Sequence, residues 1–289
     1  TPANLEKLDR YLEISRRLAD PRKLTPAEAG ALIKEARIIT MITLSLHATE
    51  VGATQMALEL AYNVAAGKNE RLAKAFEQEI LYIVPTNPDG QQMIVDWYEK
   101  WVGTEYEGGS MPWLYHHYAG HDNNRDWFML NLAETRAVFE LYFRSAVPQA
   151  VLDMHQQQSN GARLFLPPYY PPGNRNVDPV IYRTINLAGA AMQLACEERG
   201  LAGVISNAYY DAYWEGSSNQ VGWWHNQIGL LSEAASVNLA SPIFIEPGEL
   251  RGDEAGFPRY EMMINFPHPW PGGWWRLRDI VDYDFAAAE

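Results

Sequence analysis

The stretch that decides the fold reads IITMITLSLHATE and spans residues 38–50. Its first nine residues are mostly apolar and rich in β-branched side chains, which predicts a buried strand. The apolar run ends at His47, and Glu50 follows three residues later. In α/β proteins the chemically active side chains collect at such strand ends and in the loops beyond them. This stretch therefore predicts both a fold class and the place of a site.

The rest of the chain alternates between helical and strand patterns. Helices are expected at 4–19, 25–36, 52–66, 69–78, 127–145 and 179–199, and strands at 38–46, 80–84, 150–153 and 228–232. Strands that alternate with helices predict an α/β layer fold with helices on both faces of a buried sheet. Because no linker or repeat interrupts the chain, we expect one domain over residues 1–289, with the helices of 1–36 packed on it.

The composition excludes several classes of protein. The chain has 23 Lys and Arg against 36 Asp and Glu, a formal charge of −13, and this field opposes binding to nucleic acid or to an anionic membrane. No run approaches the roughly 18 apolar residues of a membrane span. Cys196 is the single cysteine, which excludes an internal disulfide and a thiolate-rich zinc site. The chain starts at Thr1 without a signal sequence, which is compatible with a removed targeting segment.

Two strand ends carry residues able to bind a metal. His47 and Glu50 follow the first strand, and an imidazole and a carboxylate this close bind a divalent ion together or, alternatively, form a polar helix cap. The strand over 150–153 ends the same way, at Met154 and His155. Two histidines and a glutamate form the His₂Glu set that leaves the fourth position of zinc open for water.

Two glutamates are candidates for a general base beside such a metal. Glu233 follows the apolar strand residues Leu230 and Leu231, and Glu246 follows a similar run over 243–245. A carboxylate that lies next to zinc without binding it is able to take a proton from water. Both glutamates therefore remain candidates for the general base.

Five short blocks, in this order, resemble the zinc carboxypeptidases of the carboxypeptidase A type over about residues 37–285. The blocks are His47-Ala48-Thr49-Glu50, Asn87-Pro88-Asp89-Gly90, Asp122-Asn123-Asn124-Arg125-Asp126-Trp127, Asp153-Met154-His155 and Glu233. The resemblance implies a central, twisted, mixed and mostly parallel sheet. It also implies hydrolysis of the C-terminal peptide bond of a peptide substrate.

The resemblance carries roles over to individual residues. It implies one zinc ion held by His47, Glu50 and His155, with Glu233 as the general base. Asp122 would accept the outer N–H of His47 and fix its ring, as metal-bound imidazoles usually require.

The remaining implied roles concern the substrate. Asn124 and Arg125 would bind its terminal carboxylate, a task that suits the two-pronged guanidinium. Tyr213 matches best the mobile tyrosine that closes over the substrate in this family, with Tyr209 and Tyr210 as close rivals.

One departure from the family concerns the oxyanion. The family normally supplies an arginine between the Asn-Pro-Asp-Gly turn and the Asn-Arg pair, but residues 91–124 contain none. Lys100, His116, His117 and His121 are the substitutes that the sequence offers. Loss of an oxyanion donor costs about 10²–10³ in turnover.

Two alternatives to a peptide carboxypeptidase follow. The first is a zinc amidase or deacylase of the same fold that acts on a cell-wall peptide or an acylated amino acid. The second is a peptide-binding relative with weak catalysis, which the missing arginine favours. Family resemblance favours a secreted or periplasmic location.

Overall fold

The computed structural model describes residues 1–117, 120–252 and 254–289. Its helices are α1 (Pro2–Leu5), α2 (Leu8–Ala19), α3 (Pro26–Glu35), α4 (Gly52–Ala65), α5 (Glu70–Ala75), α6 (Pro88–Trp101), α7 (Ala133–Glu140), α8 (Pro179–Glu198), α9 (Ser218–Val221) and α10 (Leu277–Ala288). Its strands are β1 (Ile38–Leu44), β2 (Glu79–Pro85), β3 (Ala150–Gln157), β4 (Leu164–Phe165), β5 (Tyr170–Gly173), β6 (Val204–Ile205), β7 (Asp211–Ala212), β8 (Ile228–Ala235), β9 (Ile243–Ile245) and β10 (Gly273–Trp275).

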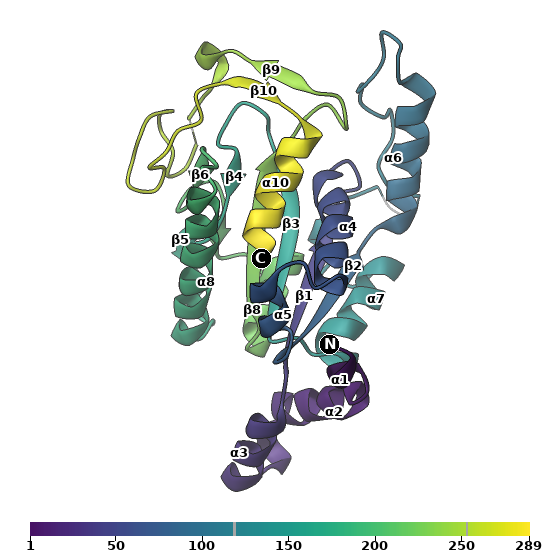
Figure 1. Ribbon diagram of the computed structural model, residues 1–289, viewed down its shortest axis with the longest axis vertical. Coiled ribbons are helices and arrows are strands. Elements are labelled where there is room, and N and C mark those ends of the chain that lie inside the picture. The colour runs from purple at the N-terminus through teal and green to yellow at the C-terminus, as the bar shows by residue number, and fades with distance from the viewer. Residues whose placement is uncertain (118–119, 253) are drawn as a thin grey trace.

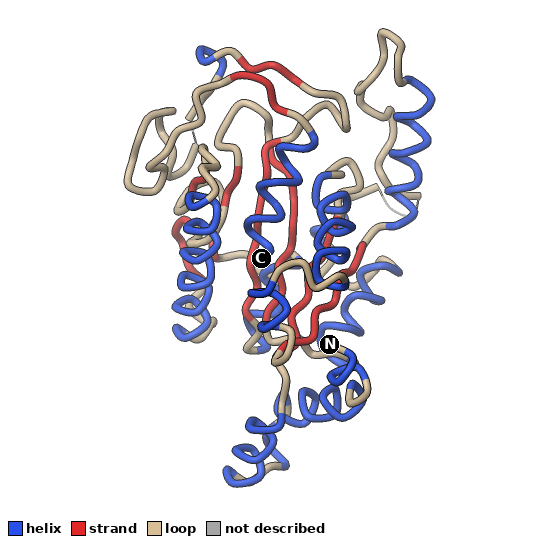
Figure 2. Tube along the Cα trace, viewed as in Figure 1, coloured by secondary structure: helices blue, strands red, loops and turns tan. Residues whose placement is uncertain are grey.

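A six-stranded sheet forms the centre of the molecule, in the order β2-β1-β3-β8-β4-β6. The strands β2, β1, β3 and β8 run parallel, whereas β4 is antiparallel to β8 and parallel to β6. Figure 2 shows these strands in red, twisting from one edge of the sheet to the other. The predicted fold class, a mixed and mostly parallel sheet with helices, is confirmed.

The two faces of the sheet are buried under different helices. Ile42 and Leu44 of β1 lie in one core cluster with residues of α4, α8 and α10, and Figure 1 shows these three helices across one face of the sheet. Ile39 and Met41 lie in the other cluster, with residues of α2 and α7. Successive strand residues point to opposite faces, so a continuous apolar run such as residues 38–44 requires cover on both sides.

Two strands continue beyond the ends that the apolar pattern predicts. The pairing of β3 with β8 runs without interruption from Ala150 with Ile228 to Gln157 with Ala235. The predicted ends at 153 and 232 were therefore too early, because backbone pairing continues where the side chains become polar. His155 and Glu233 consequently lie inside strands.

Three helix boundaries also differ from the expected ones. Residues 87–90, read from the sequence as a turn, instead begin the helix α6, which the Asn87 side chain caps by accepting from Gly90 N at 3.0 Å. The predicted helix over 127–145 begins only at Ala133, since the Asp126 carboxylate holds the preceding loop through Leu132 N at 2.9 Å. The predicted helix over 4–19 is divided into α1 and α2.

The strand order places the ends of β1 and β3 side by side. From β1 the chain continues to β2 on one side, and later returns to β3 on the other side. Such a reversal of strand order leaves a crevice at the carboxyl ends of the strands, where ligands bind in open α/β sheets. His47 follows β1 and His155 lies near the end of β3, so this crevice is where the predicted ligands meet.

Candidate metal centre

His47, Glu50 and His155 converge on one point. One ligand atom of each lies within 4.8 Å of the others. The Nδ1 atoms of the two histidines are 3.2 Å apart, and the Glu50 oxygens lie 2.8 Å from His47 Nδ1 and 2.9 Å from His155 Nδ1. A turn after β1, closed by the Glu50 N–H donating to His47 O at 3.0 Å, brings the first two side chains together. Ser45, at φ 47°, bends the chain into that turn.

Each imidazole is held from behind by a carboxylate. His47 Nε2 lies 2.9 Å from Asp122 Oδ1, and His155 Nε2 lies 2.9 Å from Asp153 Oδ2. Because a carboxylate only accepts, each outer nitrogen donates its proton to the aspartate behind it, and in the neutral imidazole this leaves the Nδ1 lone pair directed toward the other ring and Glu50. Lone pairs that face one another at this distance fit a cation placed between them. The three residues thus fit one divalent ion of the zinc type.

Electrostatics favour positive charge at this point. Burial alone would lower the pKa of His47, but the charge of Glu50 and the hydrogen bond to Asp122 raise it to about 9. The site therefore attracts protons in the absence of a metal, and a divalent ion would replace them.

Asp153 is a site residue whose role the sequence analysis missed. The residue is buried, and its carboxylate accepts from Thr43 Oγ1 at 2.6 Å and from the Ser218 hydroxyl, in addition to His155. Residues i and i+2 of a strand share a face. The pattern Asp153-Met154-His155 in a strand was the signal that would have revealed this pairing.

Glu233 lies beside the histidines, whereas Glu246 does not. Glu233 pairs with His155 in the parallel register of β8 and β3, so both side chains project from the same face of the sheet. Burial raises the pKa of Glu233 to about 8, with the nearby charge of His155 opposing and that of Glu50 adding to this shift. Glu246 is exposed at the end of β9, and its N–H donates to Glu249 Oε2 at 2.8 Å.

Asn124 and Arg125 lie next to the ligand set in different environments. Asn124 is buried, and its Oδ1 accepts from Ser218 N at 2.9 Å while its Nδ2 lies 3.4 Å from His155 Nε2. The Arg125 side chain is 54% exposed. Its Nη1 lies 3.5 Å from Asp122 Oδ2, and its guanidinium lies over the Trp214 ring at 5.0 Å.

The tyrosines that the sequence could not separate occupy different places. Tyr213 is 54% exposed and precedes Trp214, the ring that Arg125 contacts. Tyr210 is largely buried near Glu233, and its hydroxyl donates to Gln157 Oε1 at 3.4 Å. The Tyr209 hydroxyl oxygen accepts a hydrogen bond from Ala162 N at 3.2 Å.

The residues named as substitutes for the missing arginine engage other groups. The Lys100 ammonium lies 4.7 Å from the Trp101 ring centre, and His116 Nε2 contacts the His121 carbonyl oxygen at 3.0 Å. His117 lines a hollow with Trp97. The exposed His121 has its Nδ1 beside the Asp122 carbonyl oxygen at 3.0 Å.

Tyr115 is a second residue that sequence reasoning did not single out. Its ring centre lies 5.6 Å from that of His47. Burial and the charges of Asp122 and Glu50 hold its pKa well above the usual range, so the hydroxyl keeps its proton. Together with Glu50, Gln156 and Gln157, Tyr115 lines a cavity of about 520 Å³.

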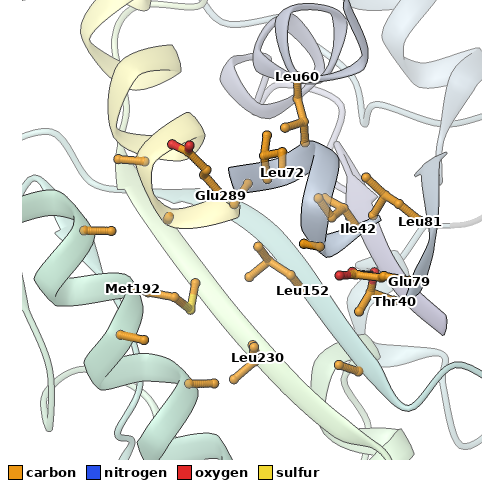
Figure 3. Close-up of a pocket in the computed structure, with 18 of the residues that line it drawn as sticks. Thr40, Ile42, Leu60, Leu72, Glu79, Leu81, Leu152, Met192, Leu230 and Glu289 are labelled. Carbon is orange, nitrogen blue, oxygen red and sulfur yellow. Dashed lines mark hydrogen bonds between the residues drawn. The ribbon is translucent and has the colours of Figure 1, made fainter. Parts of the chain in front are cut away.

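A separate cavity lies away from the ligand set. It measures about 300 Å³ and lies between the sheet and the helices α5, α8 and α10 (Figure 3). Its lining is mainly apolar, with Ile42, Leu152, Met192 and Leu230 among the residues drawn. None of the predicted site residues lines it.

The fold and the site together define a mixed α/β protein with a single-metal His₂Glu centre at the carboxyl ends of its central strands. Residues 25–142 match the family model described as zinc carboxypeptidase. The family resemblance that the sequence motifs predicted is thereby confirmed. No curated protein sequence matches this chain.

Two solved structures with similar folds carry the name carboxypeptidase. A metallo-carboxypeptidase from Burkholderia cenocepacia superposes with a TM-score of 0.59 at 14% identity, over 91% of this chain and 57% of its own. A protein of Shewanella denitrificans OS-217, provisionally assigned as a carboxypeptidase A, superposes with a TM-score of 0.53 at 17% identity, over 87% of this chain and 55% of its own. At these identities the likeness establishes the fold, and the chain spans little more than half the length of either structure.

None of the helices in the described part of the chain combines the length and apolar character needed to cross a bilayer.

Proposed function

We propose that the protein is a zinc metallocarboxypeptidase that hydrolyses the C-terminal peptide bond of peptides. The observation that carries this proposal is the pairing of Glu233 with His155 on adjacent parallel strands, beside three ligands that converge within 4.8 Å. A His₂Glu set with a neighbouring, unligated carboxylate is the arrangement of a hydrolytic zinc site.

The proposed chemistry divides between the ion and the chain. A zinc ion held by the three ligands would supply Lewis acidity toward a carbonyl oxygen and toward water. Glu233 would take a proton from the attacking water and return it to the departing amine. Asp122 and Asp153 would keep both imidazole rings in the tautomer whose Nδ1 faces the ion.

Arg125 supplies the preference for a free C-terminus in this proposal. Its side chain is half exposed beside the ligand set, with Asp122 3.5 Å from Nη1, so other guanidinium N–H groups remain available to a substrate carboxylate. Asn124 borders the same space. The exposed Tyr213, next to Trp214, is our candidate for the tyrosine that closes over the bound peptide.

Metal content and hydrolysis of an N-blocked dipeptide test the proposal. We expect one zinc ion per chain and release of the C-terminal amino acid, with little cleavage when the C-terminus is amidated. Stoichiometric zinc without cleavage of any C-terminal residue would instead favour a peptide-binding protein. Cleavage of acylated amino acids alone would favour the amidase.

A further inference from the structure

Tyr115 and Glu233 lie next to different histidines of the ligand set. The strand order places β1 before β3 and β3 before β8. Tyr115 lies against the ring of His47, which follows β1, with 5.6 Å between ring centres. Glu233 lies on β8, in register with His155. A carbonyl group bound at the ligands would therefore have a proton acceptor next to His155 and the Tyr115 side chain next to His47.

The Asn-Pro-Asp-Gly turn holds Tyr115 at this place. Asn87 Nδ2 donates both to Leu46 O at 3.2 Å and to Tyr115 O at 3.1 Å, which ties Tyr115 to the residue that precedes the ligand His47. Gly90 permits the approach, because a Cβ at that position would lie 2.1 Å from Tyr115 O. The backbone of Tyr115 is thus fixed relative to the metal centre by two residues of one turn.

The Tyr115 hydroxyl is available to a ligand. No hydrogen-bond partner for this hydroxyl lies among residues 1–117, 120–252 and 254–289. The charges of Asp122 and Glu50 raise the pKa of this hydroxyl and that of Arg125 lowers it, so the hydroxyl lies within electrostatic range of the centre. Tyr115 also lines the 520 Å³ cavity that reaches Glu50. A hydroxyl in this position supplies one O–H donor to a bound molecule.

The candidate cations of the same segment contact other groups in the described chain. Lys100 lies over Trp101, and His116 is engaged with His121. His117 lines a hollow together with Trp97. Residues 91–124 contain no arginine, and Tyr115 is a donor that the described part of this segment places against the ligand His47.

We propose that the Tyr115 hydroxyl donates a hydrogen bond to the oxygen of the scissile carbonyl as negative charge develops on it. This inference rests on the proposed function, and it assigns to a neutral tyrosine the task that an arginine performs elsewhere in the family. Donors preorganised toward a developing oxyanion stabilise the transition state more than the ground state. The interaction therefore acts on kcat more than on KM.

Tyr115→Phe tests this assignment because it removes only the hydroxyl oxygen. With the zinc-loaded protein and an N-blocked dipeptide, we expect kcat to fall by about 10²–10³ with KM changed less than about threefold. Zinc content by atomic absorption stays at the wild-type value. A peptide analogue with a phosphinate at the scissile position, measured by calorimetry, loses affinity in parallel with kcat/KM, whereas the product amino acid binds as before.

Tyr106→Phe is the matched control, since Tyr106 is exposed and packs on Trp101 in the same segment. It should leave every readout unchanged.

An unchanged kcat in Tyr115→Phe, loss of zinc, or equal loss of phosphinate and product affinity would overturn the assignment while the proposed function stands. An inactive wild-type protein would overturn both. If Tyr115→Phe unfolds early, Tyr115→His, which keeps a ring N–H donor, should retain more turnover than Tyr115→Leu, and equal turnover of the two would contradict the assignment.

Discussion

His155 and Glu233 occupy facing positions on the parallel strands β3 and β8. His155 holds its Nδ1 toward His47 and Glu50, and Glu233 places a partly buried carboxylate beside that cluster without joining it. A rigid sheet therefore sets the separation between the proposed metal ligand and the proposed base. Sites built on strands hold such geometry more accurately than sites on loops.

Replacing the proposed base should separate catalysis from metal binding. We expect Glu233→Gln to keep one zinc per chain and to lower kcat by about 10²–10⁴, because the amide cannot take a proton from water. Steady-state hydrolysis and atomic absorption measure the two quantities. Glu246→Gln is the control, since Glu246 is exposed at the end of β9. Greater loss in the control would mean that the base is misassigned.

Removal of the metal should destabilise the fold. Without a cation, two Nδ1 atoms 3.2 Å apart and a carboxylate face one another. Free zinc at about 1,000 times its Kd should add about 4 kcal/mol to the free energy of unfolding. Thermal unfolding in zinc and in chelator measures the shift, and His47→Ala should show none. The same Tm for the wild type in both solutions would argue against the site.

The partner of His155 should govern zinc affinity. In Asp153→Asn the ring of His155 loses its carboxylate acceptor, 2.9 Å from Nε2, and we expect a 10- to 100-fold weaker zinc Kd, roughly the usual effect of such partners. Competition with a chelating dye gives the Kd. Asp282→Asn, which removes a carboxylate from an exposed ion pair on α10, controls for charge. Equal affinity in both variants would contradict the role of Asp153.

Loss of the proposed carboxylate anchor should change selectivity. Arg125→Ala should raise KM for dipeptides with a free C-terminus and leave the slow cleavage of amidated dipeptides unchanged. The reason is that only the free carboxylate pairs with the guanidinium. Arg144→Ala, which alters an exposed ion pair with Glu140, is the control. A proportional loss on both substrates would remove the anchoring role.

Asp284 should make stability depend on pH. Both of its carboxylate oxygens are buried without a hydrogen-bond partner in the described chain, and burial, with the charge of Glu50 added, raises its pKa far above the usual value. The unfolded-state pKa of an aspartate is about 3.9. When the folded-state pKa is higher than this, the group contributes its full stability only at pH values below the unfolded-state pKa. That contribution is lost as the pH rises toward the folded pKa.

Asp284→Asn should therefore be more stable than the wild type at pH 7, and the difference should shrink as the pH approaches 4. Each unit of pKa difference is worth about 1.4 kcal/mol. Urea unfolding at pH 4 and pH 7 measures the effect, with Asp282→Asn as the exposed control. A difference in the free energy of unfolding between Asp284→Asn and the wild type that stays constant with pH would contradict this prediction.

The sequence by itself determined the layer architecture and the metal ligands. A continuous apolar run over residues 38–46 that ends at His47 requires cover on both faces, and alternation with helical patterns makes the sheet mostly parallel. Local patterns also revealed where polar groups follow strands. They could not reveal that β3 and β8 continue through His155 and Glu233, because backbone pairing is decided by the neighbouring strand and leaves no mark in a polar sequence.

Only the tertiary structure decided which of the remaining candidates meet. Glu233 and Glu246 follow equally apolar runs, but β8 lies next to β3, whereas β9 pairs with β10 outside the central sheet. Ser218 and Tyr115 joined the centre through contacts across 65 residues or more, such as that of Ser218 with Asp153. The physical reason is that chain topology sets such proximities, and no local propensity encodes the distance between segments so far apart.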